Sequence, residues 1–149
     1  LGIEPLSAPF GAASLAAILA DRTRRLKALL LDQTVIAGMG NIYTDEALWE
    51  ARLHPSRPAG SLSPQEMDAL AAAIPAVLNR GIENLGTSLG TGASNFIFPG
   101  TDVQAHNQED LRVFQRTGTP CRRCGTPIAR IIVAQRSTHI CPACQRHDV

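Results

Sequence analysis

All four cysteines of this 149-residue chain lie within its last thirty residues, in two Cys-x-x-Cys pairs separated by sixteen residues. The pairs are Cys121 with Cys124, and Cys141 with Cys144. This spacing is typical of a four-thiolate zinc site, because each pair turns two sulfurs toward one point and two pairs complete a tetrahedron. Four protein ligands leave no open coordination position, so the sequence predicts one zinc ion with a structural role.

Two other interpretations of the cysteines are weaker. Two disulfide bonds would be expected in a secreted protein, and the sequence shows neither a signal-peptide segment nor further cysteines. A redox site needs a single Cys-x-x-Cys pair beside a βαβ unit, whereas this chain carries two pairs in its tail. The β-branched residues at 128–133 and 138–140 instead predict a β-hairpin between the pairs, turning near residues 134–137.

The basic residues gather toward the two ends of the chain. Residues 1–27 carry four basic residues against two acids, and residues 110–149 carry seven arginines against two acids. Residues 28–109 carry nine acids against three arginines, so the net charge is only +1. Arginine outnumbers lysine thirteen to one, and its planar guanidinium suits phosphate. A basic zinc module favours a nucleic-acid partner, although a solvated surface would show the same charge. No apolar run is long enough to span a membrane.

A second candidate phosphate site lies in the middle of the chain. Gly38 and Gly40 flank Met39 and permit a turn with positive φ, and Asn41 follows where the N-cap of a helix belongs. Such a helix start offers backbone N–H groups and a side-chain amide, which is a phosphate-binding geometry. Residues 44–46 would place acidic side chains in the first turn of that helix. An ordinary capped helix after a tight turn would show the same pattern.

The remaining pattern predicts a mainly α-helical domain. One helix is expected to run from Ser14 towards Asp21, and a capping box formed by Ser63 and Glu66 opens a second, longer helix. The apolar residues of the longer helix share one face and are expected to form the core: Met67, Leu70, Ala71, Ile74, Val77, Leu78, Ile82 and Leu85.

The segments outside these helices are expected to be irregular. Residues 1–9 contain two prolines and are interpreted as a linker or the tail of an upstream domain. Residues 86–109 are expected to form a long loop, and residues 111–114 a short strand that leads into the zinc module. The chain would therefore consist of a helical domain, residues 1–109, and a zinc finger, residues 110–149.

Two separate motifs resemble the formamidopyrimidine-DNA glycosylase family, which includes the endonuclease VIII group. The helix-two-turns-helix domain of that family is resembled by KALLLDQ at 27–33, GMGNIY at 38–43 and EAL at 46–48. Its zinc finger, particularly in the formamidopyrimidine branch, is resembled by GTPC at 118–121, CGTPI at 124–128 and AQR at 134–136. The resemblance covers nearly the whole chain. It implies a mainly α fold, in which a helix-two-turns-helix bundle is followed by a small four-cysteine zinc-finger β-hairpin.

The resemblance also implies roles for individual residues. Asn41 and Arg136 match residues that grip the phosphates flanking a flipped-out damaged nucleotide, and the family's arginine is also assigned a catalytic role in δ-elimination. That role is expected to be electrostatic, because the pKa of arginine is too high for ordinary acid chemistry. Lys27 matches a lysine near the lesion, or is a charge on a helix surface. Three nearby arginines are further expected contacts with DNA phosphates: Arg22, Arg24 and Arg25.

The chain departs from the family where the chemistry takes place. The family's nucleophile is an N-terminal proline followed by a glutamate, and its amine forms a Schiff base with the sugar. This chain begins with Leu-Gly-Ile-Glu, and the nitrogen of Pro5 is locked in an amide. The chain alone is therefore expected to lack glycosylase and lyase activity. Residues 95–99 also differ from the lesion-recognition segment of the family, so the sequence does not predict a preference for 8-oxoguanine.

The expected function is therefore that of the DNA-binding half of a base-excision repair glycosylase and abasic-site lyase acting on oxidised purines, namely 8-oxoguanine and formamidopyrimidines. Its expected partners are double-stranded DNA containing a damaged base or an abasic site, and the catalytic domain that precedes this region in the family. The same resemblance implies a monomer in the bacterial cytoplasm, associated with the nucleoid. Two rival functions stay open, namely an RNA-binding module and a structural or protein-interaction zinc ribbon.

Overall fold

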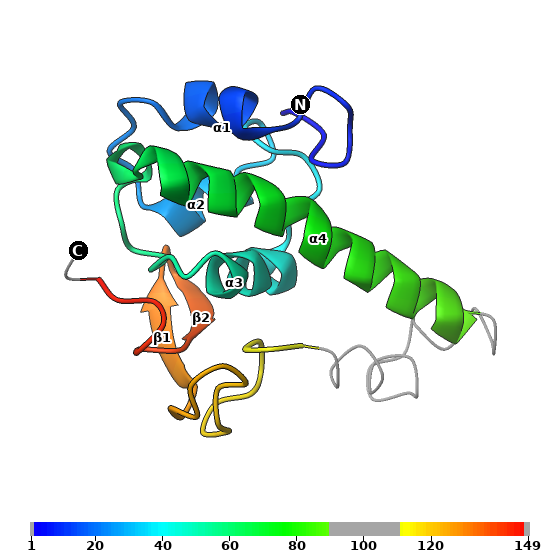
Figure 1. Cartoon of the computed structure of the whole chain (residues 1–149), viewed down its shortest axis with the longest axis vertical. Coiled ribbons are helices and arrows are strands. Elements are labelled where there is room, and N and C mark those ends of the chain that lie inside the picture. Colours follow the sequence, from blue (N-terminus) through cyan, green and yellow to red (C-terminus); the bar gives the residue numbers. More distant parts are fainter. Residues whose placement is uncertain (1, 90–110, 148–149) are drawn as a thin grey trace.

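The computed structural model describes residues 2–89 and 111–147 of the chain, as a helical bundle with a β-hairpin beside it (Figure 1). In chain order, the elements are α1 (Ala12–Leu19), α2 (Leu26–Leu31), α3 (Asn41–Glu50), the short 3-10 helix η1 (Ala59–Ser61), α4 (Pro64–Leu89), β1 (Ala129–Val133) and β2 (Arg136–Ile140). The expected fold class, a mainly helical bundle followed by a small antiparallel hairpin, is confirmed. Within the described residues, no helix is long and apolar enough to cross a membrane.

The core of the bundle is built by α4, which packs against α1 and α3. Apolar residues spaced three and four apart on each helix face inward, so that one leucine-rich cluster is shared by all four helices. Most of the expected face of α4 is buried, including Leu70, Ile74 and Val77. Ile82 is a correction, because its side chain is 56% exposed where the α4 stripe leaves the bundle.

The start of α4 is fixed by the expected capping box. The Ser63 hydroxyl accepts the backbone N–H of Glu66 at 3.1 Å, and the Glu66 carboxylate accepts the backbone N–H of Ser63 at 2.8 Å. Arg57 adds a bidentate ion pair to the same carboxylate. At the start of α1, Ser14 lies inside the helix, and its hydroxyl accepts the backbone N–H of Gly11 at 2.8 Å and donates to the Gly11 carbonyl at 3.0 Å. The helix therefore begins at Ala12, earlier than expected, and ends at Leu19.

The N-terminal segment packs against the bundle, which corrects the expectation of a linker. The Gly2 N–H donates to the Gln33 carbonyl at 2.9 Å, and the Ile3 N–H donates to the Val35 carbonyl at 3.1 Å. The Ile3 carbonyl in turn accepts the N–H of Ala37 at 2.9 Å. A Cβ atom at Gly2 would lie only 2.2 Å from the Val35 carbonyl carbon, so this close approach of two backbones requires glycine.

The β-hairpin is closed by a two-residue turn between Val133 and Arg136, which are paired in the ladder. Ala134 and Gln135 form the turn with φ angles of 53° and 63°, as in the type I′ turns that match the twist of hairpin strands. Neither residue is a glycine, so each carries the cost of a left-handed conformation. The hairpin and its turn region were both predicted, and the turn places Arg136 on the first residue of β2.

Two expected segment assignments differ from the structure. Residues 111–114 form bends and a turn rather than a strand, because their backbone N–H groups bind a side chain of α3. The expected loop at 86–109 begins later, because α4 continues to Leu89. The rest of that segment, including residues 95–99, lies outside the described residues.

Candidate zinc centre and nucleic-acid interface

The four cysteine sulfurs converge on one point, as their spacing predicted. The Sγ atoms of Cys121, Cys124, Cys141 and Cys144 all lie within 4.8 Å of one another. Individual Sγ–Sγ distances are 3.4 Å between Cys124 and Cys141, and 3.9 Å between Cys121 and Cys144. A tetrahedral zinc ion with Zn–S bonds of about 2.3 Å sets its ligand sulfurs about 3.8 Å apart. The cysteine cluster therefore fits one four-coordinate zinc ion.

The local backbone prepares these sulfurs to bind a cation. The Arg123 N–H points at the Cys121 sulfur and the Cys144 N–H points at the Cys141 sulfur, both at 3.4 Å. Burial opposes ionisation of Cys121, but hydrogen bonds from Arg123, Cys124 and Trp49 outweigh it and lower the pKa of that thiol to about 6. Burial raises the pKa of Cys141 to about 12. A divalent cation would stabilise all four thiolates, so metal binding is expected to release protons.

Helix α3 contributes a side chain directly to this centre. The indole N–H of Trp49 donates to the Cys121 sulfur at 3.4 Å, and Trp49 belongs to the same apolar cluster as Val113, Ile128 and Cys141. The guanidinium of Arg123 lies 3.7 Å from the centre of the indole ring and donates to the backbone carbonyl of Trp49. The core of the zinc module is therefore completed by a residue of the helical bundle.

Glu46, also on α3, binds the segment that leads into the zinc module. Its buried carboxylate accepts three backbone N–H groups, from Arg112 at 2.8 Å, Val113 at 2.8 Å and Phe114 at 3.0 Å. The sequence pattern predicts this glutamate in the first turn of a helix, as a partner for the helix dipole. The structure shows no acidic residue in the first turn of α3. Periodicity could not reveal that this carboxylate turns inward toward a segment more than sixty residues away.

The C-terminal end of the module is fastened in a similar way. Gln145 is buried, and its amide oxygen accepts the Cys141 N–H at 2.9 Å while its amide nitrogen donates to the Leu53 carbonyl at 3.0 Å. Beside it, the rings of His54 and His147 stack with centroids 4.5 Å apart. These contacts attach the second cysteine pair to the segment that follows α3. None of these three side chains is predicted from the sequence to hold the module.

Lys27 occupies a buried pocket between the bundle and the hairpin, which corrects the expectation of a surface charge. Its side chain is 0% exposed, and its ammonium group donates to Asp45 Oδ1 at 2.7 Å, to the Ser137 carbonyl at 3.0 Å and to Thr138 Oγ1 at 2.7 Å. Burial lowers the pKa of Lys27, and the Asp45 carboxylate opposes that shift. An ammonium group has three hydrogens, so in this structure none is left for a DNA phosphate.

Asn41 contacts Ser137, the residue that follows Arg136, at one edge of this pocket. Asn41 is the first residue of α3 rather than its N-cap, which is Gly40 and makes no side-chain cap bond. The Asn41 amide nitrogen donates to the Ser137 carbonyl at 3.1 Å, while its amide oxygen has no hydrogen-bond partner among the described residues. Arg136, the residue directly before Ser137, is exposed. The Asn41 amide is therefore bonded to the residue that follows an exposed arginine.

The turn before α3 is held in shape by Gln33. Its amide oxygen accepts the Gly38 N–H at 2.8 Å, and its amide nitrogen donates to the Met39 carbonyl at 2.8 Å. Gly38 has a φ of 86°, as the paired glycines predicted, whereas Gly40 has a φ of −104° that any residue can adopt. Met39 is buried in the core, so the turn is anchored on both sides.

The basic cluster before α2 is exposed. Arg22, Arg24 and Arg25 all lie on the surface, on the connection between α1 and α2. Arg24 pairs with Asp32 at 3.0 Å. The Thr34 hydroxyl and the Arg24 guanidinium together lower the pKa of Asp32 to about 2. These arginines can reach a ligand from solvent, but no contact joins them to Asn41 or Arg136 in the described residues.

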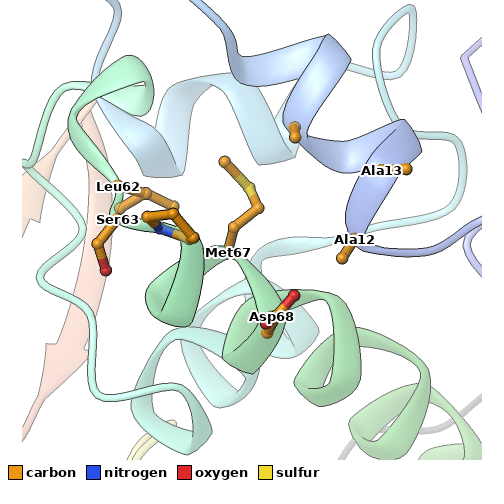
Figure 2. Close-up of a pocket in the computed structure, with 8 residues that line it drawn as sticks. Ala12, Ala13, Leu62, Ser63, Met67 and Asp68 are labelled. Carbon is orange, nitrogen blue, oxygen red and sulfur yellow. The ribbon is translucent and has the colours of Figure 1, made fainter.

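One hollow of the bundle lies between α1 and the start of α4. Figure 2 shows the residues that line it: Ala12 and Ala13 on α1, Met67 and Asp68 on α4, and Leu62 and Ser63 just before α4. The hollow has a volume of about 350 Å³ and is lined mainly by apolar side chains. None of the predicted site residues lines this hollow.

Two known protein families match separate parts of this chain. Residues 1–92 match the family described as the formamidopyrimidine-DNA glycosylase H2TH domain, where H2TH denotes helix-two-turns-helix. Residues 118–146 match the zinc finger found in FPG and IleRS, and this match includes all four cysteines and the hairpin. The cysteine cluster is therefore a zinc site, as its geometry indicated.

Individual relatives cover the chain almost completely. A formamidopyrimidine-DNA glycosylase of Herpetosiphon aurantiacus is 50% identical over 145 residues, which are 97% of this chain and 51% of that protein. The chain spans about half the length of the curated relatives it matches.

Solved structures show the same fold. The glycosylase of Lactococcus lactis, bound noncovalently to DNA containing an abasic site, superposes with a TM-score of 0.82 at 35% identity, over 99% of this chain and 51% of that one. The MutM (Fpg) protein of Thermus thermophilus superposes with a TM-score of 0.81 at 40% identity, over 100% of this chain and 55% of that one.

Proposed function

The chain belongs to the formamidopyrimidine-DNA glycosylase family, and we propose that it is the part of such an enzyme that holds duplex DNA by its phosphates around a damaged base or an abasic site. Its helical domain (1–109) and its zinc finger (110–149) would form one grip on the DNA backbone. Because the chain covers about half of its relatives' length, we assign it the binding of DNA phosphates and not the excision of oxidised purines. That chemistry would require a catalytic domain.

One observation supports this proposal above the others. The Asn41 amide donates to the carbonyl of Ser137, the residue directly after the exposed Arg136, although Asn41 and Arg136 belong to modules far apart in the sequence. Phosphate groups are commonly bound by a helix start together with an arginine fork. The two groups would contact consecutive phosphates, and the charge of Arg136 would assist a leaving phosphate in the complete enzyme.

The exposed cluster of Arg22, Arg24 and Arg25 would add further phosphate contacts on the bundle side. Such contacts carry no sequence information, so the chain should bind DNA with little sequence preference and with strong salt dependence. We propose that the chain acts as a monomer on the bacterial chromosome, in the cytoplasm, because its relatives are bacterial DNA glycosylases.

The decisive experiment measures binding of the chain to a duplex carrying an abasic-site analogue, at two salt concentrations. The double variant Asn41→Ala/Arg136→Ala should bind at least about tenfold more weakly, and the slope of log K against log salt should fall by about one. Asn79→Ala/Arg80→Ala is the matched control, because it removes the same two functional groups from α4 and should bind like the wild type.

Other outcomes would assign the chain differently. Equal binding by the wild type and the Asn41→Ala/Arg136→Ala variant would move the contacts to the basic cluster before α2. Preference for A-form RNA over the duplex would favour the RNA-binding alternative, for which the shared zinc-finger family is the supporting observation. No affinity at low salt for either nucleic acid would favour a structural zinc module. A lesion-cleavage assay of the chain alone should give no product.

A further inference from the structure

We propose that Lys27 is a positioning residue, which locks the hairpin carrying Arg136 to the helix start carrying Asn41 and does not itself touch DNA. The proposal rests on the proposed function, because it concerns how the phosphate grip is assembled. It replaces the expectation of a direct contact between Lys27 and DNA, since the ammonium group is buried and fully bonded within the protein.

The partners of Lys27 come from both modules. Lys27 lies on α2, and one of its acceptors, Asp45, lies on α3 one helical turn after Asn41. The other two acceptors are the Ser137 carbonyl and the Thr138 hydroxyl, which immediately follow Arg136 on β2. A single ammonium group therefore joins three elements, and any rotation of the hairpin relative to the bundle would break at least one of its bonds.

The network extends from Lys27 to both phosphate-binding candidates. The Ser137 carbonyl accepts from Lys27 and also from the Asn41 amide. The Thr138 hydroxyl accepts from Lys27 and donates to the Arg136 carbonyl at 3.0 Å, so it restrains the backbone of that arginine. On the other side, Asp45 Oδ2 accepts the backbone N–H of His139 at 3.0 Å and lies 3.1 Å from its Nδ1. Three consecutive hairpin residues after Arg136 are thus tied to the bundle.

A lysine suits this position better than any other side chain. A buried ion pair seldom stabilises a fold more than apolar residues of similar size would, so stability alone does not explain its presence. The lysine instead fixes the relative positions of its three acceptors, because each of the three hydrogens on its tetrahedral nitrogen points at one of them. The planar fork of arginine does not match that arrangement. The chain has thirteen arginines and this one lysine.

A double-mutant cycle distinguishes positioning from direct contact. The variant Lys27→Met/Asp45→Asn removes both buried charges together, while the asparagine keeps an acceptor for the His139 N–H. In the wild-type background it should weaken binding to the abasic duplex roughly tenfold, whereas in the Asn41→Ala/Arg136→Ala background it should change binding by less than about twofold. Binding can be kept measurable in all four proteins at low salt. Equal losses in both backgrounds would indicate a direct contact, and no loss in either would overturn the proposal.

A control variant and a conservative variant sharpen the interpretation. Arg80→Met/Glu50→Gln removes another ion pair of the same net charge, the half-exposed one at 3.0 Å between α4 and α3, and should leave binding unchanged. Lys27→Arg keeps the charge, so it should preserve binding if Lys27 contacts phosphate. The positioning role instead predicts that Lys27→Arg binds as weakly as Lys27→Met/Asp45→Asn. Zinc content and the thermal melting of each variant would verify folding.

A measurement without DNA separates failure of this proposal from failure of the proposed function. Because Lys27 is the only lysine, its ammonium group should give a single slowly exchanging ¹⁵N signal in the free wild-type chain. In Lys27→Met/Asp45→Asn, the amides of Thr138 and His139 should exchange faster with solvent, because the hairpin separates from α3 more often without its bonds to Lys27, while the amides of α4 stay protected. If these amides keep their protection, the proposal is wrong even where DNA binding is confirmed. If they lose it and the wild type binds no DNA, the lock exists and the proposed function is wrong.

Discussion

The indole N–H of Trp49 lies 3.4 Å from the sulfur of Cys121, so a helix of the bundle donates a hydrogen bond to a zinc ligand. Such a bond orients the thiolate and stabilises its charge when the metal is bound. Arg123 covers the face of the same indole ring. Because Trp49 is the only tryptophan and is buried, its fluorescence reports on the junction between the two modules.

Removal of zinc with a chelator should shift the emission of Trp49 to longer wavelength, because the indole would lose its packing against the cysteine cluster. The Cys124→Ser variant should show the same shift in the presence of zinc. Helical circular dichroism should fall only slightly, since Leu70 and Ile74 belong to a core cluster that contains no residue of the zinc module. Emission that does not change on chelation would argue against a metal-dependent junction, and simultaneous melting of bundle and tail would argue against two modules.

Replacement of Glu46 by glutamine should destabilise the chain by about 2–3 kcal/mol, because the neutral side chain cannot accept all three buried N–H groups. The matched control is Glu50→Gln, which affects a half-exposed ion pair and should cost less than about 1 kcal/mol. Urea denaturation of the two variants measures the difference. Equal losses would show that the carboxylate of Glu46 is not the anchor of residues 112–114.

Gly81→Ala should also be destabilising, by about 1–3 kcal/mol, although alanine favours helices. A Cβ atom at residue 81 would lie 2.2 Å from the Tyr43 hydroxyl oxygen, so the Tyr43 ring would have to shift out of its place between α3 and α4. In a Tyr43→Ala background, the same substitution should instead be stabilising, because the clash is gone and only the helix preference is left. Thermal melting of the four proteins tests this change of sign.

The ion pair between Arg57 and Glu66 predicts a loss of stability in acid. The Arg57 guanidinium, opposed by partial burial, holds the pKa of Glu66 below its ordinary value of 4.5. A carboxyl whose pKa is lowered by folding stabilises the fold above its unfolded pKa, and that contribution disappears as the pH falls through the folded value. Glu66→Gln should therefore be less stable than the wild type near neutral pH. The two proteins should converge well below pH 4.5, as urea denaturation at several pH values would show.

The parts of this fold that follow from short sequence patterns could be predicted. Cysteine spacing predicted the cluster of Cys121, Cys124, Cys141 and Cys144, and the capping box of Ser63 and Glu66 predicted the start of α4. These features depend on residues close in sequence or on a fixed ligand geometry, so the pattern contains nearly all the required information.

The junction between the modules could not be predicted in the same way. Lys27 and Thr138 are separated by more than a hundred residues, and Asp45 and Glu46 have the same appearance as ordinary first-turn acids. Their roles depend on which face of α3 the hairpin covers, and helical periodicity does not specify that face. Only one local feature of the sequence indicated that these acids are buried. Asp45 and Glu46 are adjacent and are followed by Ala-Leu-Trp, in a helix that mixes polar and apolar residues.

The zinc module is held to the bundle by side chains from α2, α3 and the segment after α3, namely Lys27, Asn41, Glu46, Trp49 and Leu53 through its carbonyl. These contacts between the modules are noncovalent. A peptide link between the modules mainly raises the local concentration of one module near the other. Residues 1–89 and 111–149, produced as separate polypeptides and mixed with zinc, should reassemble into the same structure. The chain would then serve as a split protein, whose two pieces recombine only when the metal is present.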